Sequence, residues 1–150
     1  MAYYSRKIKL PFQEALIKVT ENLKQEGFGI ITSIDVQDTF RQKLNTAFRN
    51  YKILDACNPQ FEYKDISLAS HIGVMLPCNV VVQQHENGEV EVSAVNPLEN
   101  ISASFNTTQL VALAGEVGDK LRAAIDNLHR EIPAAHVEAL PTEAWKDTMD

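Results

Sequence analysis

Cysteine is scarce in this chain of 150 residues: only Cys57 and Cys78 occur, and they form no C-x-x-C motif. This count argues against a disulfide-stapled secreted domain and against a four-ligand zinc site. No run approaches the roughly 20 apolar residues that a membrane helix needs. The first ten residues also lack the apolar core of a signal peptide. We therefore expect a cytoplasmic protein with reduced thiols and no membrane partner.

Basic residues and catalytic signatures are scarce as well. The chain has 14 Lys and Arg against 20 Asp and Glu, which gives a net charge of −6. Affinity for DNA or RNA depends on clustered basic side chains, so we expect no nucleic-acid partner. There is no G-x-S-x-G nucleophile motif, and Gly27-Phe28-Gly29 is too short for a phosphate-binding G-x-G-x-x-G. The residues point to no catalytic group and no particular cofactor.

What the sequence does contain is an alternation of strand and helix patterns. Apolar residues recur at helical spacing from Phe12 to Leu23 and from Leu110 to Leu128. Shorter helices are expected over 36–44, capped by Asp35, and from Asn58-Pro59 through about Ile66. Strand-like runs cover 3–9, 28–34, 51–57, 78–84 and 89–95, and Asn87-Gly88 predicts a hairpin between the last two. This order predicts one α+β domain over 1–130 and a loosely packed or partly disordered tail over 131–150.

The two thiols are the main candidates for chemistry. Cys57 precedes a predicted helix N-terminus, where the macrodipole favours a thiolate and lowers the pKa. Cys78 follows Pro77 at the start of a strand, so both thiols could lie at one end of the sheet. A reactive pair, a soft-metal site or a ligand contact competes with the alternative of two buried, small apolar side chains. The histidines are better explained as ordinary structural residues, although a contact between the first of them and Cys78 stays open; they are His71, His85, His129 and His136.

Two cysteine motifs carry a family resemblance: Ala56-Cys57-Asn58-Pro59 and Leu76-Pro77-Cys78-Asn79. With Gly27-Phe28-Gly29 upstream and Asn96-Pro97 downstream, the chain resembles the DUF302 family of uncharacterised prokaryotic proteins over about residues 4–128. Glu62-Tyr63-Lys64 departs from the family pattern, because members tend to carry a small residue there. This departure affects the shape of any pocket beside the short helix.

The resemblance implies a fold but no activity. It implies an α+β fold similar to one repeat of the TATA-box-binding protein, β-α-β(4)-α with added short helices, often as a homodimer. The sheet would be mainly antiparallel, with the first and last helices packed on one face. We expect these helices to bury six apolar residues between them: Leu16, Val19, Leu23, Leu113, Val117 and Leu121. The opposite sheet face would then form the dimer interface, with apolar residues drawn from Val80, Val82, Val90 and Val92.

Our leading hypothesis is a homodimeric binding module that holds a small ligand or soft metal near Cys57 and Cys78. Its predicted ligand-binding residues are Cys57, Asn58, Pro77, Cys78 and Asn79. In this hypothesis Cys57 contacts the ligand as a thiolate, while Asn58 caps the helix whose N–H groups face an anion. One alternative is a thiol or sulfur redox enzyme that cycles Cys57 and Cys78 between dithiol and disulfide. Another is a structural protein whose sheet face binds a partner.

Overall fold

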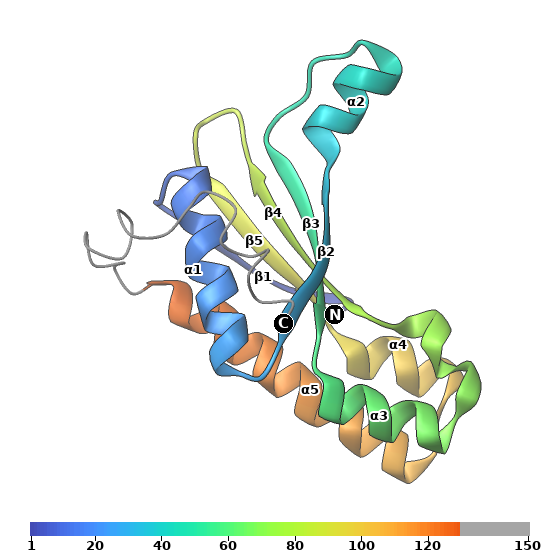
Figure 1. The fold of residues 1–150 in the computed structure, drawn as a ribbon. Coiled ribbons are helices and arrows are strands. Elements are labelled where there is room, and N and C mark those ends of the chain that lie inside the picture. Colours follow the sequence, from blue (N-terminus) through green and yellow to red (C-terminus); the bar gives the residue numbers. More distant parts are fainter. Residues whose placement is uncertain (130–150) are drawn as a thin grey trace.

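A five-stranded antiparallel sheet forms the centre of this computed structural model, which describes residues 1–129 (Figure 1). The predicted tail over 131–150 lies outside the described residues. The strand order is β1-β5-β4-β3-β2, so the first two strands of the sequence form the two edges. This arrangement confirms the predicted mainly antiparallel α+β fold. The strands are β1 (Tyr3–Ile8), β2 (Gly29–Asp35), β3 (Tyr51–Cys57), β4 (Cys78–Gln84) and β5 (Val90–Val95).

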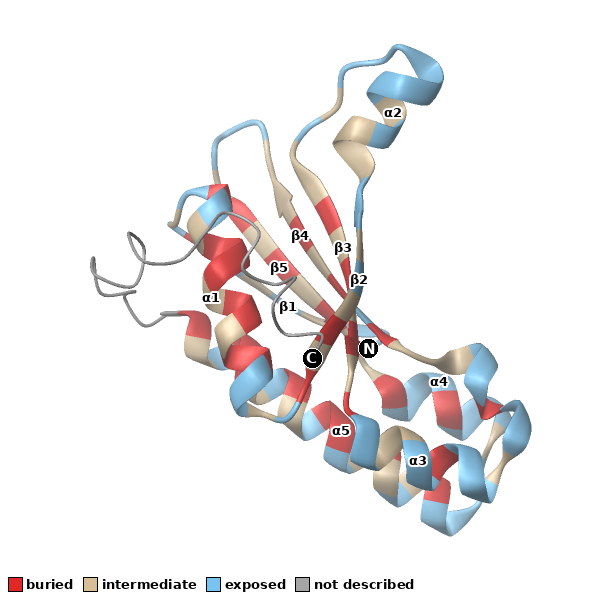
Figure 2. Ribbon diagram, in the orientation of Figure 1, coloured by how far each residue is buried: buried red, intermediate tan, exposed pale blue. Residues whose placement is uncertain are grey.

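Two helices cover one face of the sheet, as predicted. Helix α1 (Phe12–Gln25) connects the two edge strands, and α5 (Thr108–Asp126) packs beside it before the short turn η2 (Asn127–His129). Their apolar stripes bury Leu16, Val19, Leu23, Val117 and Leu121 in one core (Figure 2). Leu113 was predicted to join them but is only half-buried. The first turns of α5 pack on α3 and α4 instead, so Leu113 lines a surface groove with Tyr63 and Leu68.

The helix-covered face carries the valines that were predicted to form a dimer interface. Val80, Val82, Val90 and Val92 are fully buried in the core. The opposite face presents the alternate residues of the same strands, among them Gln83, Glu91 and Ser93, which are half-buried. The choice of these valines was wrong because alternation separates two faces without saying which one the helices cover. The homodimer itself stays a prediction.

Helix α2 (Val36–Leu44) extends beyond the end of the sheet, where none of its residues is buried (Figure 1). Its bounds match the prediction, and the Asp35 side chain accepts a hydrogen bond from the backbone N of Asp38 at 3.0 Å. At the same end of the sheet, the predicted hairpin joins β4 to β5, and Gly88 adopts a φ of +86°. That left-handed conformation is the reason glycine suits the turn.

Three short elements gather at the other end of the sheet: α3 (Pro59–Leu68), the turn η1 (Ser70–Met75) and α4 (Pro97–Ser104). Of these, η1 and α4 form a small second core with the start of α5, made of Ile72, Ile101, Leu110 and Ala114. Helix α4 was not predicted, although Asn96 caps it and Pro97 begins it. Thr107 caps α5, because its Oγ1 accepts a hydrogen bond from the backbone N of Leu110. No helix within residues 1–129 is both long and apolar enough to cross a membrane.

Candidate functional site

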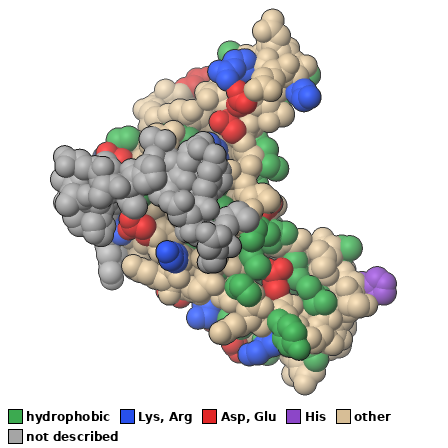
Figure 3. Space-filling model, in the orientation of Figure 1, with side chains coloured by type: hydrophobic (Ala, Val, Ile, Leu, Met, Phe, Trp, Pro, Cys, Tyr) green, Lys and Arg blue, Asp and Glu red, His purple; other side chains and the backbone are tan. Residues whose placement is uncertain are grey.

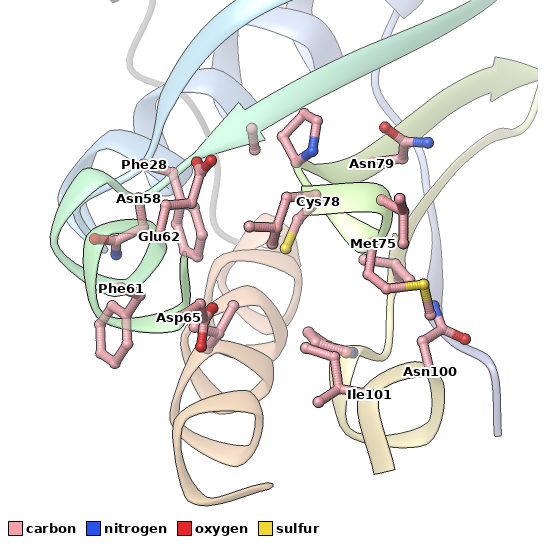
Figure 4. Close-up of a pocket in the computed structure, with 17 residues that line it drawn as sticks. Phe28, Asn58, Phe61, Glu62, Asp65, Met75, Cys78, Asn79, Asn100 and Ile101 are labelled. Carbon is pink, nitrogen blue, oxygen red and sulfur yellow. The ribbon is translucent and has the colours of Figure 1, made fainter. Parts of the chain in front are cut away.

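A cavity of about 360 Å³ lies where α3, η1 and α4 meet the start of β4 (Figure 4). It contains four of the five predicted ligand-binding residues, because Asn58, Pro77, Cys78 and Asn79 all line it. Cys57 does not line it. The two cysteine motifs therefore meet at the end of the sheet that the sequence indicated, through Ala56 and Asn58 of the first motif and all four residues of the second, Leu76-Pro77-Cys78-Asn79.

Cys78 begins β4 and lies opposite Ala56 on β3, on the helix-covered face. Its side chain lines the cavity and is 8% exposed (Figure 4). Burial raises the pKa of this thiol to about 12, and the nearby carboxylates of Glu62 and Asp65 act in the same direction. Negative charge and a low-polarity environment both disfavour a thiolate, so Cys78 is a neutral thiol near pH 7.

Cys57 ends β3, directly before Asn58 and the start of α3. Its predicted low pKa is wrong, because burial, a hydrogen bond to Glu62 and the charge of Glu62 raise the pKa to about 12. Burial is the largest of these causes, and Glu62, in the first turn of α3, opposes the thiolate that the helix N-terminus would favour. Both cysteines are free. Alternation along β3 places Cys57 and Ala56 on opposite faces, and Cys78 shares the face of Ala56.

Asn58 fixes one corner of the cavity to the end of α1. Its side chain is 8% exposed and donates from Nδ2 to the backbone oxygen of Glu26 at 3.3 Å. The predicted side-chain cap on α3 is absent among the described residues, because the amide is engaged there instead. Gly27 makes this contact possible: its φ is +90°, and a Cβ on it would lie 3.1 Å from Asn58 Nδ2. A glycine is therefore required on two grounds.

Two carboxylates that the sequence did not single out line the same cavity. Glu62 and Asp65 lie three residues apart on α3 and so share one helix face. Asp65 is only 4% exposed. Among the described residues, Asp65 Oδ1 and Glu62 Oε2 are buried without a hydrogen-bond partner. Burial, followed by the charge of Glu62, raises the pKa of Asp65 above its ordinary value. The departure of Glu62-Tyr63-Lys64 from the family pattern was the one sequence signal at this position.

The rest of the cavity wall is mainly apolar, and no Lys, Arg or His is among the 17 residues that line it. Hydrophobic side chains also gather on the surface of this part of the molecule, with acidic atoms among them (Figure 3). Asn79 and Asn100 are the exposed polar residues of the lining. The remaining wall is formed by apolar residues that include Phe28, Phe61, Met75, Leu76, Ile101 and Val117.

The histidines lie away from the cavity wherever the structure describes their side chains. His71 is exposed on η1, and His85 Nε2 lies 2.8 Å from Glu91 Oε1 on the far part of the sheet. His136 falls outside the described residues. Within residues 1–129, no group of three or more His, Cys, Asp or Glu is placed to hold a metal ion.

The sequence matches the family profile described as "Domain of unknown function DUF302" over residues 4–128. The chain belongs to the DUF302 family. It is also similar to a solved structure, an uncharacterised conserved DUF302 protein from Bacillus stearothermophilus, with a TM-score of 0.79 and 28% identity. That match covers 86% of this chain and 99% of the other. No curated protein matches the sequence.

The DUF302 match contains the whole cavity, because its lining runs from Phe28 to Val117. The site thus belongs to the part of the chain that defines the family. The family is described as one of unknown function, and the similar Bacillus protein is itself uncharacterised. A function for this DUF302 chain must therefore be argued from the chemistry of the cavity.

Proposed function

We propose that this protein is a cytoplasmic binding module for a small organic molecule, which is held in the cavity beside Cys78. One observation carries the proposal: a cavity of about 360 Å³, mainly apolar, contains two buried carboxylate oxygens without partners. Small-molecule sites are typically concave and apolar, with a few converging polar groups, and span roughly 300–1,000 Å³. Buried polar groups are nearly always hydrogen-bonded, so two orphaned oxygens in one cavity favour a missing partner.

Apolar residues give the cavity its shape, and a few polar groups supply hydrogen-bonding atoms. Phe28, Leu76 and Ile101 supply apolar wall for the body of a ligand. Cys78 supplies a small neutral side chain, and Asn58 ties the wall to the end of α1. The carboxylates of α3 supply acceptors. They also oppose the anionic ligand of the sequence hypothesis, because two nearby negative charges repel an anion.

The redox alternative draws less support from the same residues. Thiol–disulfide exchange needs a thiolate as the attacking group, and its rate depends on the thiolate fraction. The raised pKa values of Cys57 and Cys78 leave very little thiolate at neutral pH. The soft-metal alternative draws no support from the described residues, which offer no group of three ligands. Binding of an organic molecule is the function that the cavity favours.

Closing the mouth of the cavity tests the proposal. Asn100 is exposed and lines the cavity, so Asn100→Trp should obstruct it. Ala103→Trp is the control, because it places the same indole on the same helix at an exposed position outside the lining. Native mass spectrometry of protein purified from its own host should detect a small molecule on the wild type and on Ala103→Trp. Asn100→Trp should lose it. Equal occupancy of all three proteins, or an empty wild type that also binds nothing from a metabolite extract, would contradict the proposal.

We also propose that the module is a homodimer, as expected from the family resemblance. Light scattering at micromolar concentration checks this. A monomeric mass contradicts it and leaves the cavity proposal unaffected, because the described residues of one chain line the whole cavity.

A further inference from the structure

Helix α3 contributes two acids, Glu62 and Asp65, to the lining of the cavity. Glu62 and Asp65 are one turn apart, and each has a buried oxygen without a partner among the described residues (Figure 4). Only 4% of the Asp65 surface is exposed to solvent. A buried carboxylate is expensive unless it is paired. The protein therefore carries an electrostatic cost at this site when the cavity is empty.

No basic group of the described chain offsets this charge within the cavity. The lining contains two acids and no Lys, Arg or His. Lys64, between the two acids in sequence, is exposed and places its Nζ 5.6 Å from the centroid of the Phe61 ring. The sulfhydryls are neutral donors, and the thiol of Cys57 already bonds to Glu62. This bond holds the Glu62 carboxylate in place and adds no positive charge.

We infer that the ligand of this cavity is an organic cation: a protonated amine whose N–H groups bond to Asp65, whose charge is also attracted by Glu62, and whose apolar body lies against Phe28, Leu76 and Ile101. This inference rests on the proposed function and adds the chemical class of the ligand. An ammonium group has three donors and a positive charge, so it can bond to the orphaned oxygen of Asp65 and is also attracted by the charge of Glu62. Charge-assisted hydrogen bonds are the stronger kind, and they strengthen further in a site that excludes water.

Three probes of similar shape separate charge from shape: benzylamine, which is a cation near neutral pH, benzyl alcohol, which is neutral, and benzoate, which is an anion. Each is titrated into the full chain while backbone amide signals are followed by NMR. Benzylamine should shift signals of α3 and of the start of β4, with an affinity at least about tenfold above that of benzyl alcohol. Benzoate should produce no saturable shift.

Matched variants then assign the preference to the two acids. Asp65→Asn and Glu62→Gln should each weaken benzylamine binding by about tenfold or more, and each should leave the affinity for benzyl alcohol unchanged. Asp119→Asn is the control, because Asp119 is an exposed acid on α5 outside the lining. It should bind benzylamine like the wild type. Amide spectra check that each variant is folded. If Asp65→Asn does not fold, the result for Glu62→Gln alone decides whether the acids attract the cation.

The failures of the inference and of the proposed function are distinguishable. If benzyl alcohol binds as tightly as benzylamine and Asn100→Trp abolishes the binding of both, the protein is still a binding module. The inference of a cationic ligand is then wrong. The cationic ligand is also overturned if neither Asp65→Asn nor Glu62→Gln weakens benzylamine binding. It is overturned as well if benzylamine causes no shift at millimolar concentration. Probe binding that Asn100→Trp leaves unchanged counts against the cavity itself and so against the proposed function.

Discussion

Replacing Asp65 by asparagine should make the unliganded protein more stable at neutral pH. The wild-type side chain keeps a buried oxygen without a partner beside the charge of Glu62. Leaving one buried polar group unsatisfied costs about 1–3 kcal/mol. Asparagine removes the charge but keeps a polar amide, so we expect a gain near the lower end, about 1 kcal/mol. For a chain of this length, that gain corresponds to a rise in melting temperature of about 2–4 °C.

The gain should depend on pH in a defined direction. The folded-state pKa of Asp65 is raised above its ordinary value of 3.8. Between these two pKa values the folded protein binds more protons than the unfolded chain, so wild-type stability falls as pH rises through this window. The advantage of Asp65→Asn should therefore be largest above the folded-state pKa and should shrink as pH falls toward 3.8, because protonation of folded Asp65 removes its charge.

Urea unfolding followed by circular dichroism, at about pH 7 and about pH 4, measures both effects. Asp119→Asn, on the exposed side of α5, is the matched control and should change the free energy of unfolding by no more than about 0.5 kcal/mol. A loss of stability for Asp65→Asn at pH 7 would refute the reasoning. It would mean that the carboxylate is needed by the fold itself, and the electrostatic argument for a cationic ligand would fall with it.

Three further predictions concern the core, the turn after α1 and the thiols. Leu121→Ala should lower the free energy of unfolding by about 2–5 kcal/mol, because the side chain is fully buried; a loss under about 1 kcal/mol in urea unfolding would contradict this. Gly27→Ala should cost about 1 kcal/mol or more, because φ is +90° there. Gly115 lies within α5, and a Cβ on it would meet no other atom within 4 Å. In the same assay, Gly115→Ala should therefore raise the free energy of unfolding by about 0.5–1 kcal/mol. Cys57 and Cys78 should both react slowly with iodoacetamide near neutral pH, because their raised pKa values keep them protonated; fast labelling of folded Cys57, seen by mass spectrometry, would contradict the effect of the neighbouring carboxylate.

Most of the fold could be predicted because its signals are local. The apolar stripes of α1 and α5, the Asp35 cap and the Asn87-Gly88 turn all depend on residues close together in sequence. Helix α4 was missed because its eight residues are too few to show a helical period, although Asn96-Pro97 marks its start in the way that Asn58-Pro59 marks α3. Which sheet face the helices cover is a property of tertiary packing, and alternation alone could not supply it.

The site was predicted in position but not in chemistry. The cysteine motifs indicated one end of the sheet, and β3–β4 pairing brings Ala56 opposite Cys78 there. Asp65 gave no signal and Glu62 only its departure from the family pattern, because acids on a short helix of mixed polarity normally face water. Asp65 is buried at a cavity whose wall is completed by η1, which follows α3 directly, and by α4, which is distant along the chain. Burial, followed by Glu62, raises the pKa of Cys57, where the helix N-terminus predicted a lowered one.

The edge positions of β1 and β2 set the order in which this chain can fold as it leaves the ribosome. β1 pairs only with β5 among the described strands, and Tyr3 lies opposite Val95. During synthesis, β1 is therefore without its partner strand until β5 has emerged, and α1 lacks its contacts with α5 until later still. Pairings so distant in sequence slow folding and prolong the exposure of apolar surface. The nascent chain thus depends on its own later half to shield its beginning, and chains released before residue 95 should be prone to aggregation.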